Sequence, residues 1–136
     1  MMIDLLVEPT NNSPLIQLES DEGKIIIKGR STPESSVDLY FPIIEKVKRL
    51  FFRSKSIEVE IALQYFNTSS SKCLFDLFKV LKVLKRRGAN LRINWYYDED
   101  DIDMLETGED YADILMLPFH FHPLLDESYA AEAMVF

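Results

Sequence analysis

The feature that most constrains this chain is one amphipathic segment lying between two predicted strands. Residues 67–70 read Asn-Thr-Ser-Ser, residue types that cap helices, and leucine and phenylalanine then recur at the 3.6-residue spacing of a helix. The basic residues 85–87 suit the negative end of the helix dipole, and Gly88 can supply the left-handed residue that ends the helix. Two predicted strands flank this helix: residues 57–63, where apolar residues alternate with two glutamates before the segment becomes apolar, and residues 91–97. Two strands joined by a helix of this length favour a parallel pair with a right-handed crossover.

The residues before this unit predict an antiparallel hairpin and a first helix. Residues 15–18 and 24–28 are rich in Ile and Leu, and a turn-forming Ser-Asp-Glu-Gly sequence joins them. The helix is predicted to begin within 31–36 and to end near Arg53, because apolar residues recur at helical spacing between these points. Pro42 removes a backbone hydrogen bond inside a helix, so we expect an irregular entry before it.

The segment 98–113 predicts a third helix with an acidic face. Nine of its sixteen residues are Asp or Glu, and the apolar residues among them leave a stripe for packing. Gly108 marks a point where this helix could be interrupted, and Pro118 is expected to end it. Residues 119–122 fit a short edge strand. The tail 123–136 is expected to be either flexible or a loosely docked helix.

These elements predict a single α/β domain over residues 1–136. The expected sheet is mixed and mostly parallel, with an antiparallel hairpin at its N-terminal edge and about three helices. A length of 136 residues with 47% apolar content supports one buried core and no second domain. No apolar run approaches the roughly 20 residues that span a bilayer, and the start lacks the features of a secretory signal. We therefore expect a cytoplasmic protein without membrane insertion.

The charges are distributed unevenly along the chain. All fifteen Lys and Arg residues lie at or before Arg92, where eleven acids accompany them, whereas the last 44 residues carry twelve acids and no base. The net charge is −8. Because an acidic protein repels phosphate backbones, we expect no nucleic acid among its partners.

Several kinds of chemistry lack the residues that they need. The four glycines are isolated, so neither a phosphate-binding loop nor a glycine-flanked serine nucleophile can be assembled. Cys73 is the single cysteine and is expected in the apolar core. His120 and His122 are too few for a closed metal site, and the acidic segment does not follow the ligand spacing of a Ca²⁺-binding EF-hand. We expect no cofactor, no metal and no enzymatic activity.

Thr68 is the candidate functional residue, and two interpretations of it remain open from the local sequence. It lies where an apolar strand leads into the N-terminus of a helix, whose free N–H groups and positive dipole end would stabilise an added phosphate. A phosphate adds about −1.5 to −2 charges and can remake a docking surface. The alternative is that Asn67, Thr68 or Ser69 only caps the helix, which is the more common role of such residues.

Four sequence blocks together resemble the SiaC-like family of bacterial regulatory phosphoproteins. They are the turn Pro33–Ser35, the run Tyr65–Lys72, the run Trp95–Asp98, and the acidic stretch from Asp100 continued by Leu117-Pro118-Phe119. The resemblance covers roughly residues 13–121. The family is similar to STAS domains, the fold of anti-sigma factor antagonists, so the resemblance implies a STAS-like α/β fold.

The resemblance also implies a function, a modified residue and partners. Thr68 would be the phosphoacceptor, and the unphosphorylated protein would bind and activate a diguanylate cyclase with a GGDEF domain, raising cyclic di-GMP and regulating biofilm formation. A cognate protein kinase of the histidine-kinase-like ATPase type and a metal-dependent PP2C-type phosphatase would set the switch. Further motif and partner-binding candidates are Asn67, Ser69, Ser70, Lys72, Pro33, Glu34, Trp95, Tyr97, Asp100, Asp101 and Asp103.

Two positions depart from the family pattern. Thr32 stands where the family has an aromatic residue, and Ser35 stands where it has Asn, so partner choice in this chain could differ. A small-ligand or nucleotide-sensing domain, as some STAS-like domains are, is the alternative function.

Overall fold

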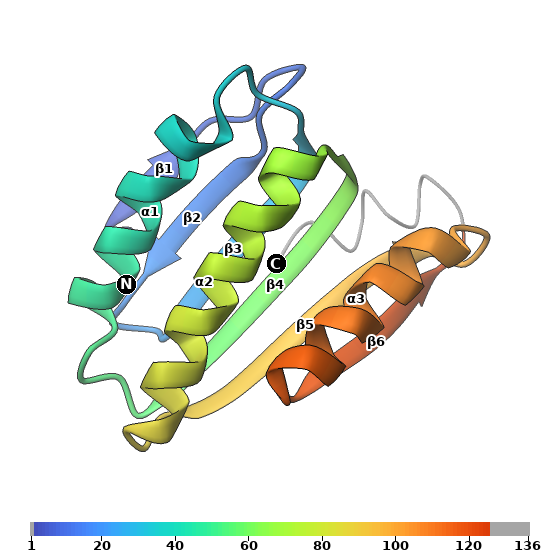
Figure 1. Ribbon diagram of the computed structural model, residues 1–136. Helices are drawn as coiled ribbons and strands as arrows, with labels where there is room; N and C mark the ends of the chain where they lie inside the picture. Colours follow the sequence, from blue (N-terminus) through green and yellow to red (C-terminus); the bar gives the residue numbers. More distant parts are fainter. Residues whose placement is uncertain (1, 126–136) are drawn as a thin grey trace.

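Three helices cover one face of a six-stranded sheet in the computed structural model, which describes residues 2–125 (Figure 1). The strands are β1 (Leu5–Val7), β2 (Leu15–Glu19), β3 (Lys24–Ser31), β4 (Ser56–Phe66), β5 (Asn90–Asp98) and β6 (Phe119–Leu124). The helices are α1 (Ser36–Leu50), α2 (Thr68–Arg86) and α3 (Ile102–Leu115).

The strands lie in the sheet in the same order as in the chain. Strands β1 to β3 pair antiparallel, whereas β3 to β6 pair parallel. Each helix connects one parallel strand to the next, so right-handed crossovers place all three helices on the same face. The predicted α/β class, the mixed and mostly parallel sheet and the N-terminal hairpin are confirmed. Strand β1 was not predicted, because three residues give too short a pattern.

The core fills the space between the helices and the facing side of the sheet. Helix α2 contributes the apolar stripe that the sequence predicted, and Asn67 caps its N-terminus. Gly88 follows the helix with φ of +113°, the left-handed conformation that suits glycine. The largest fully buried side chains of this core are Trp95, Tyr40, Phe51 and Phe78.

The expected irregular entry to the first helix is wrong. Helix α1 is regular from Ser36, and Pro42 lies inside it. Pro42 and Asp38 are both exposed, so solvent can satisfy the Asp38 carbonyl that loses its helical partner. The buried face of the helix and the Ser35 cap, which accepts a bond from Asp38 N at 3.3 Å, offset the remaining cost.

Helix α3 is not interrupted at Gly108, which is buried in its middle. A side-chain carbon at this position would lie 2.7 Å from Trp95 Nε1, so glycine allows the helix to pass close over the tryptophan ring. Met116, in the left-handed conformation at φ of 55°, ends the helix before Pro118. Strand β6 runs two residues further than predicted, through Pro123 to Leu124. The remainder of the predicted tail lies outside the described residues.

Candidate functional site

The first turn of α2 lies at the carboxyl edge of the parallel sheet, where β4 ends at Phe66 (Figure 1). Sites in open α/β sheets form at this edge, which is where the sequence placed the candidate residue. The backbone N–H of Asn67 donates to the carbonyl oxygen of Ser31 at 3.0 Å. The end of β3 therefore fixes the point at which the chain enters the helix.

Asn67 organises this turn through its side-chain oxygen. Asn67 Oδ1 accepts a bond from the backbone N–H of Ser70 at 2.9 Å and one from the hydroxyl of Ser69 at 3.1 Å. This is the geometry of a helix N-cap, and it assigns the capping role to Asn67. Thr68 is the first residue of the helix and is not its cap.

A network of buried hydroxyl groups joins the turn to β3 and α1. Ser70, which is fully buried, lies 2.8 Å from Ser31 Oγ and 3.0 Å from Ser36 Oγ. Ser31 Oγ also lies 2.7 Å from the hydroxyl of Tyr40, and Ser36 Oγ lies 2.8 Å from Ser69 Oγ. Burial raises the pKa of Tyr40 to about 12, so its hydroxyl stays neutral. Three elements thus meet at one hydrogen-bonded cluster.

Ser71 ties the same turn to the acidic helix α3. Its hydroxyl lies 2.8 Å from the hydroxyl of Tyr111, which also donates to the carbonyl oxygen of Ser71 at 2.8 Å. Tyr111 is buried against Phe78 and Trp95. The first turn of α2 therefore contacts both neighbouring helices directly, so a structural change in this turn would reach α1 and α3.

Thr68 differs from the three serines that follow it. Its side chain is exposed, as is that of Ser69, but among these four residues Thr68 alone makes no side-chain hydrogen bond within residues 2–125. Lys72 is also exposed and lies four residues further along, which places both side chains on the same side of the helix. An anion on Thr68 would therefore lie at a positive helix end, next to one cation.

The other predicted partner-binding residues fall into two groups. Glu34 is exposed and Pro33 half-buried, in the connection between Ser31 and Ser36, so they lie beside the first turn of α2. Asp100 and Asp103 are exposed at the start of α3, at the same edge of the sheet. Asp101 caps α3, because its Oδ1 accepts a bond from Met104 N at 3.0 Å.

Trp95 and Ser70 cannot contact a partner directly, because both side chains are fully buried. Trp95 Nε1 donates to the carbonyl oxygen of Met104 at 3.0 Å, so the tryptophan holds α3 on the sheet. Tyr97 is half-buried and packs against the core. The sequence prediction for Trp95 and Ser70 is corrected to a packing role, since their burial depends on helix crossings that the sequence does not display.

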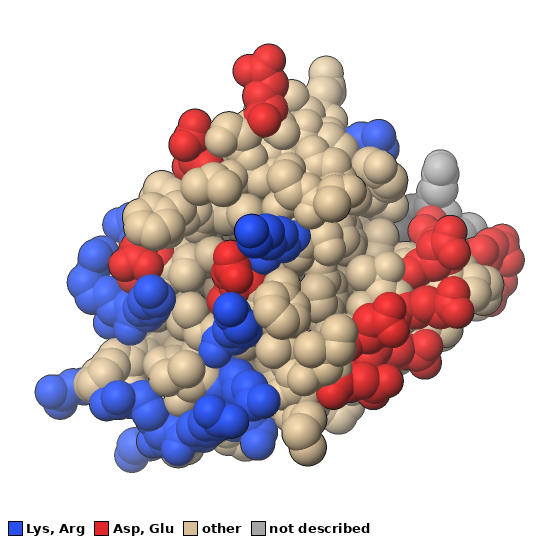
Figure 2. Space-filling model, in the orientation of Figure 1, with Lys and Arg blue, Asp and Glu red and all other residues tan. Residues whose placement is uncertain are grey.

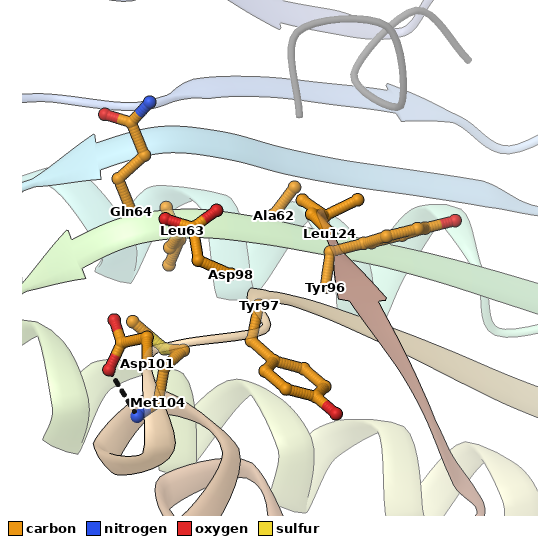
Figure 3. A pocket seen from close by; sticks show the side chains of 9 residues that line it. All are labelled: Ala62, Leu63, Gln64, Tyr96, Tyr97, Asp98, Asp101, Met104 and Leu124. Atoms are coloured by element: carbon orange, nitrogen blue, oxygen red, sulfur yellow. Dashed lines mark hydrogen bonds between the residues drawn. The ribbon is translucent and has the colours of Figure 1, made fainter. Parts of the chain in front are cut away.

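A hollow at the carboxyl ends of β4 and β5 is lined by residues of these two strands, by Asp101 and Met104 at the start of α3, and by Leu124 (Figure 3). Its volume is about 20 Å³, which holds about one water molecule. Small-molecule sites occupy roughly 300 Å³ or more. A nucleotide does not fit at this edge, so the geometry here does not favour the ligand-sensing alternative.

The sequence did not identify a polar cluster on the sheet face opposite the helices. Asn94 Nδ2 donates to Glu58 Oε2 and to Glu60 Oε1, both at 3.3 Å, while its Oδ1 lies 2.9 Å from His122 Nε2. Burial, and then the Glu58 carboxylate, raises the pKa of Glu60. The alternation of Glu58 and Glu60 along the strand was the available signal. Among residues 2–125 no group of three or more side chains could hold a metal ion.

Comparisons with known proteins agree with this geometry. Residues 7–124 match the model of the SiaC family regulatory phosphoproteins. An uncharacterized protein of Pseudomonas aeruginosa (strain UCBPP-PA14) is 30% identical over 119 residues, covering 87% of this chain and 94% of that protein.

Two solved structures share the fold. The crystal structure of apo-SiaC from Pseudomonas aeruginosa superposes with a TM-score of 0.81 at 28% identity, covering 90% of this chain and 99% of that one. SiaC in the crystal structure of the diguanylate cyclase SiaD with its activator SiaC, from the same organism, gives a TM-score of 0.81 at 28% identity. That comparison covers 87% of this chain and 98% of the other.

Proposed function

The chain belongs to the SiaC family of regulatory phosphoproteins, and we propose that it is a protein-binding switch whose phosphoacceptor is Thr68. In this proposal the unphosphorylated form binds and activates a diguanylate cyclase with a GGDEF domain, and phosphorylation releases it. A related SiaC, 28% identical, is the activator of the cyclase SiaD in a solved complex. The switch itself carries out no chemistry.

The observation that carries the proposal is the contrast between Thr68 and Ser69, Ser70 and Ser71. Ser69 and Ser70 bond to Ser36, and Ser71 bonds to Tyr111. Freeing any of these hydroxyls for a kinase would cost roughly 0.5 to 1.5 kcal/mol for each hydrogen bond, and exposing Ser70, which is buried, would cost more. Thr68 is accessible without any such rearrangement.

The expected effect of the phosphate is electrostatic. The phosphate is tolerated in the free protein, because the helix end and Lys72 are both favourable to it. In a complex, the same group must lose its water against the partner surface, and an unpaired buried charge costs several kcal/mol. A loss of about 2.7 kcal/mol already weakens binding a hundredfold.

The proposal includes the enzymes that set the switch and the compartment. A cognate kinase of the histidine-kinase-like ATPase type adds the phosphate, and a PP2C-type phosphatase removes it in the cytoplasm. Within residues 2–125 no helix is long and apolar enough to cross a membrane.

The site of modification is tested with the cognate kinase and intact-mass and fragment-ion mapping. We expect one phosphate on Thr68 in the wild-type chain and in the matched control Ser69→Ala, and none in Thr68→Ala. Full phosphorylation of Thr68→Ala contradicts the assignment.

A further inference from the structure

Two oppositely charged surfaces lie on different sides of the molecule (Figure 2). We name the first the basic end, formed by residues 46–55 and 79–87, which together contain ten Lys and Arg residues and no acid. It covers the C-terminal ends of α1 and α2, at the lower left of the figure. The second, at the right of the figure, is the acidic face of α3.

The basic end is more than a solvated surface, because it surrounds an apolar hollow. The hollow has a volume of about 190 Å³ and is lined by Phe52, Val80, Val83 and Leu84, with Lys48 and Arg87 at its sides. Phe52 and Val83 are 49% and 52% exposed. Arg87 lies 4.0 Å from the centre of the Phe52 ring. A surface of this kind fits a partner that carries both carboxylates and an apolar side chain.

The cations on the outer side of α2 repeat at regular helical positions. Lys79, Lys82 and Arg86 follow the spacing i, i+3 and i+7, which spans about 10 Å of one helix side. Within residues 2–125, Lys82 and Arg86 form no ion pair, and Lys79 has one 3.7 Å contact with Asp76 and lies 5.4 Å from the centre of the Phe75 ring. These charges are therefore available to another molecule.

The acidic face of α3 has the matching spacing. Four of its exposed carboxylates are Glu106, Glu109, Asp110 and Asp113, which occupy positions i, i+3, i+4 and i+7 of one helix; Asp103 is exposed one turn before them. Exposed apolar side chains lie just beyond them, with Ile114 at 67% and Met116 at 80% exposure. The α3 face thus carries carboxylates that match the cations of the basic end and exposed apolar side chains that match its hollow.

From this complementarity we propose that the α3 face of one copy docks on the basic end of a second copy of the chain. The three cations of α2 face the carboxylates of the partner's helix, and the exposed apolar side chains at the end of that helix cover the hollow. The contact uses different surfaces on the two copies, so it is heterologous. It is separate from Thr68, which lies at the opposite end of α2. Association through these two surfaces is therefore independent of phosphorylation at Thr68.

The test is sedimentation velocity on the full chain over a concentration series, at low and high salt. We expect the weight-average mass to rise with concentration at low salt. The dissociation constant should rise at least tenfold at high salt, because screening shortens from about 10 Å at 0.1 M to about 3 Å at 1 M. A chain that stays monomeric at low salt up to its solubility limit overturns the proposal.

Charge-reversal variants identify the surfaces. The double variants Lys82→Glu with Arg86→Glu, and Glu106→Lys with Asp110→Lys, should each lose association at least tenfold, and mixing the two should restore it. The control is Glu8→Lys with Asp38→Lys, exposed positions outside both surfaces, which changes net charge as much as the α3 variant and should leave association unchanged. Loss in the basic-end variant but not in the α3 variant, or no recovery on mixing, shows a different contact and overturns the proposal.

Discussion

Replacing Gly108 by alanine tests how closely α3 packs on the sheet. The new side-chain carbon would lie 2.7 Å from Trp95 Nε1 and 2.8 Å from both Cδ1 and Cε2, whereas comfortable contacts are about 3.5 to 4.0 Å. The ring cannot move away easily, because it is fully buried and its N–H is bonded to Met104. The helix must therefore shift.

The magnitude follows from two opposing contributions. Overpacking a core costs about 1 to 3 kcal/mol, and three close contacts with an immobile ring place this site near the upper value. The higher helix propensity of alanine stabilises the folded state by about 1 kcal/mol relative to glycine. We expect a net loss of about 2 kcal/mol, which for 136 residues lowers Tm by about 7 °C.

Thermal and denaturant unfolding of Gly108→Ala provide the measurement, with Glu106→Ala as the exposed control on the same helix. In a Trp95→Phe background, where the ring is smaller, the penalty of Gly108→Ala should shrink, which a double-mutant cycle detects. Equal or higher stability of Gly108→Ala than of wild type would refute the close approach of helix and ring.

Three further changes have defined outcomes. Tyr40→Phe should lower the free energy of unfolding by about 1 kcal/mol by removing the hydroxyl that bonds Ser31, whereas the exposed control Tyr65→Phe should not; equal effects in urea unfolding would exclude the network. Glu60→Gln should raise Tm at neutral pH. The pKa of Glu60 is raised in the folded state, so the folded protein favours the protonated carboxyl, and wild-type stability falls as the pH rises from 4.5 through the folded pKa. The gain should vanish near pH 4 in a melting series, and a pH-independent gain would contradict this cause. Thr68→Asp should keep its circular dichroism spectrum and lose cyclase binding, while Thr68→Ala should keep both; an unfolded Thr68→Asp would contradict the placement of this side chain at an exposed helix end.

The elements that the sequence predicted are those with local signals. Helix α2 has a cap at Asn67, a continuous apolar stripe and a glycine stop at Gly88, so both its ends could be placed. Pro42 misled the prediction because its cost depends on whether solvent reaches the Asp38 carbonyl, which only the folded structure decides. Strand β1 exists through its pairing with β2 and has no pattern of its own.

The candidate site was predictable only in part, because some of its features depend on contacts between residues that are distant in the sequence. The sequence located Thr68 at the entry to a helix, but it did not distinguish a phosphoacceptor from a cap. The folded chain assigns the cap to Asn67 and buries Ser70 against Ser31, 39 residues away, whereas the phosphoacceptor role of Thr68 stays a prediction. Trp95 was named as a partner-binding candidate because its full burial depends on the close crossing of α3 at Gly108, which the sequence does not display.

The measurement that tests the switch most directly is calorimetric titration of a diguanylate cyclase partner with stoichiometrically phosphorylated and with unphosphorylated protein. Circular dichroism of both forms is the folding control, and phosphorylated protein treated with a phosphatase is the matched control for recovery of binding. We predict that the unphosphorylated form binds and that the phosphate on Thr68 weakens binding about a hundredfold or more. In the complex the phosphate loses its hydration without gaining a compensating positive charge. Equal affinity of the two folded forms would contradict the account.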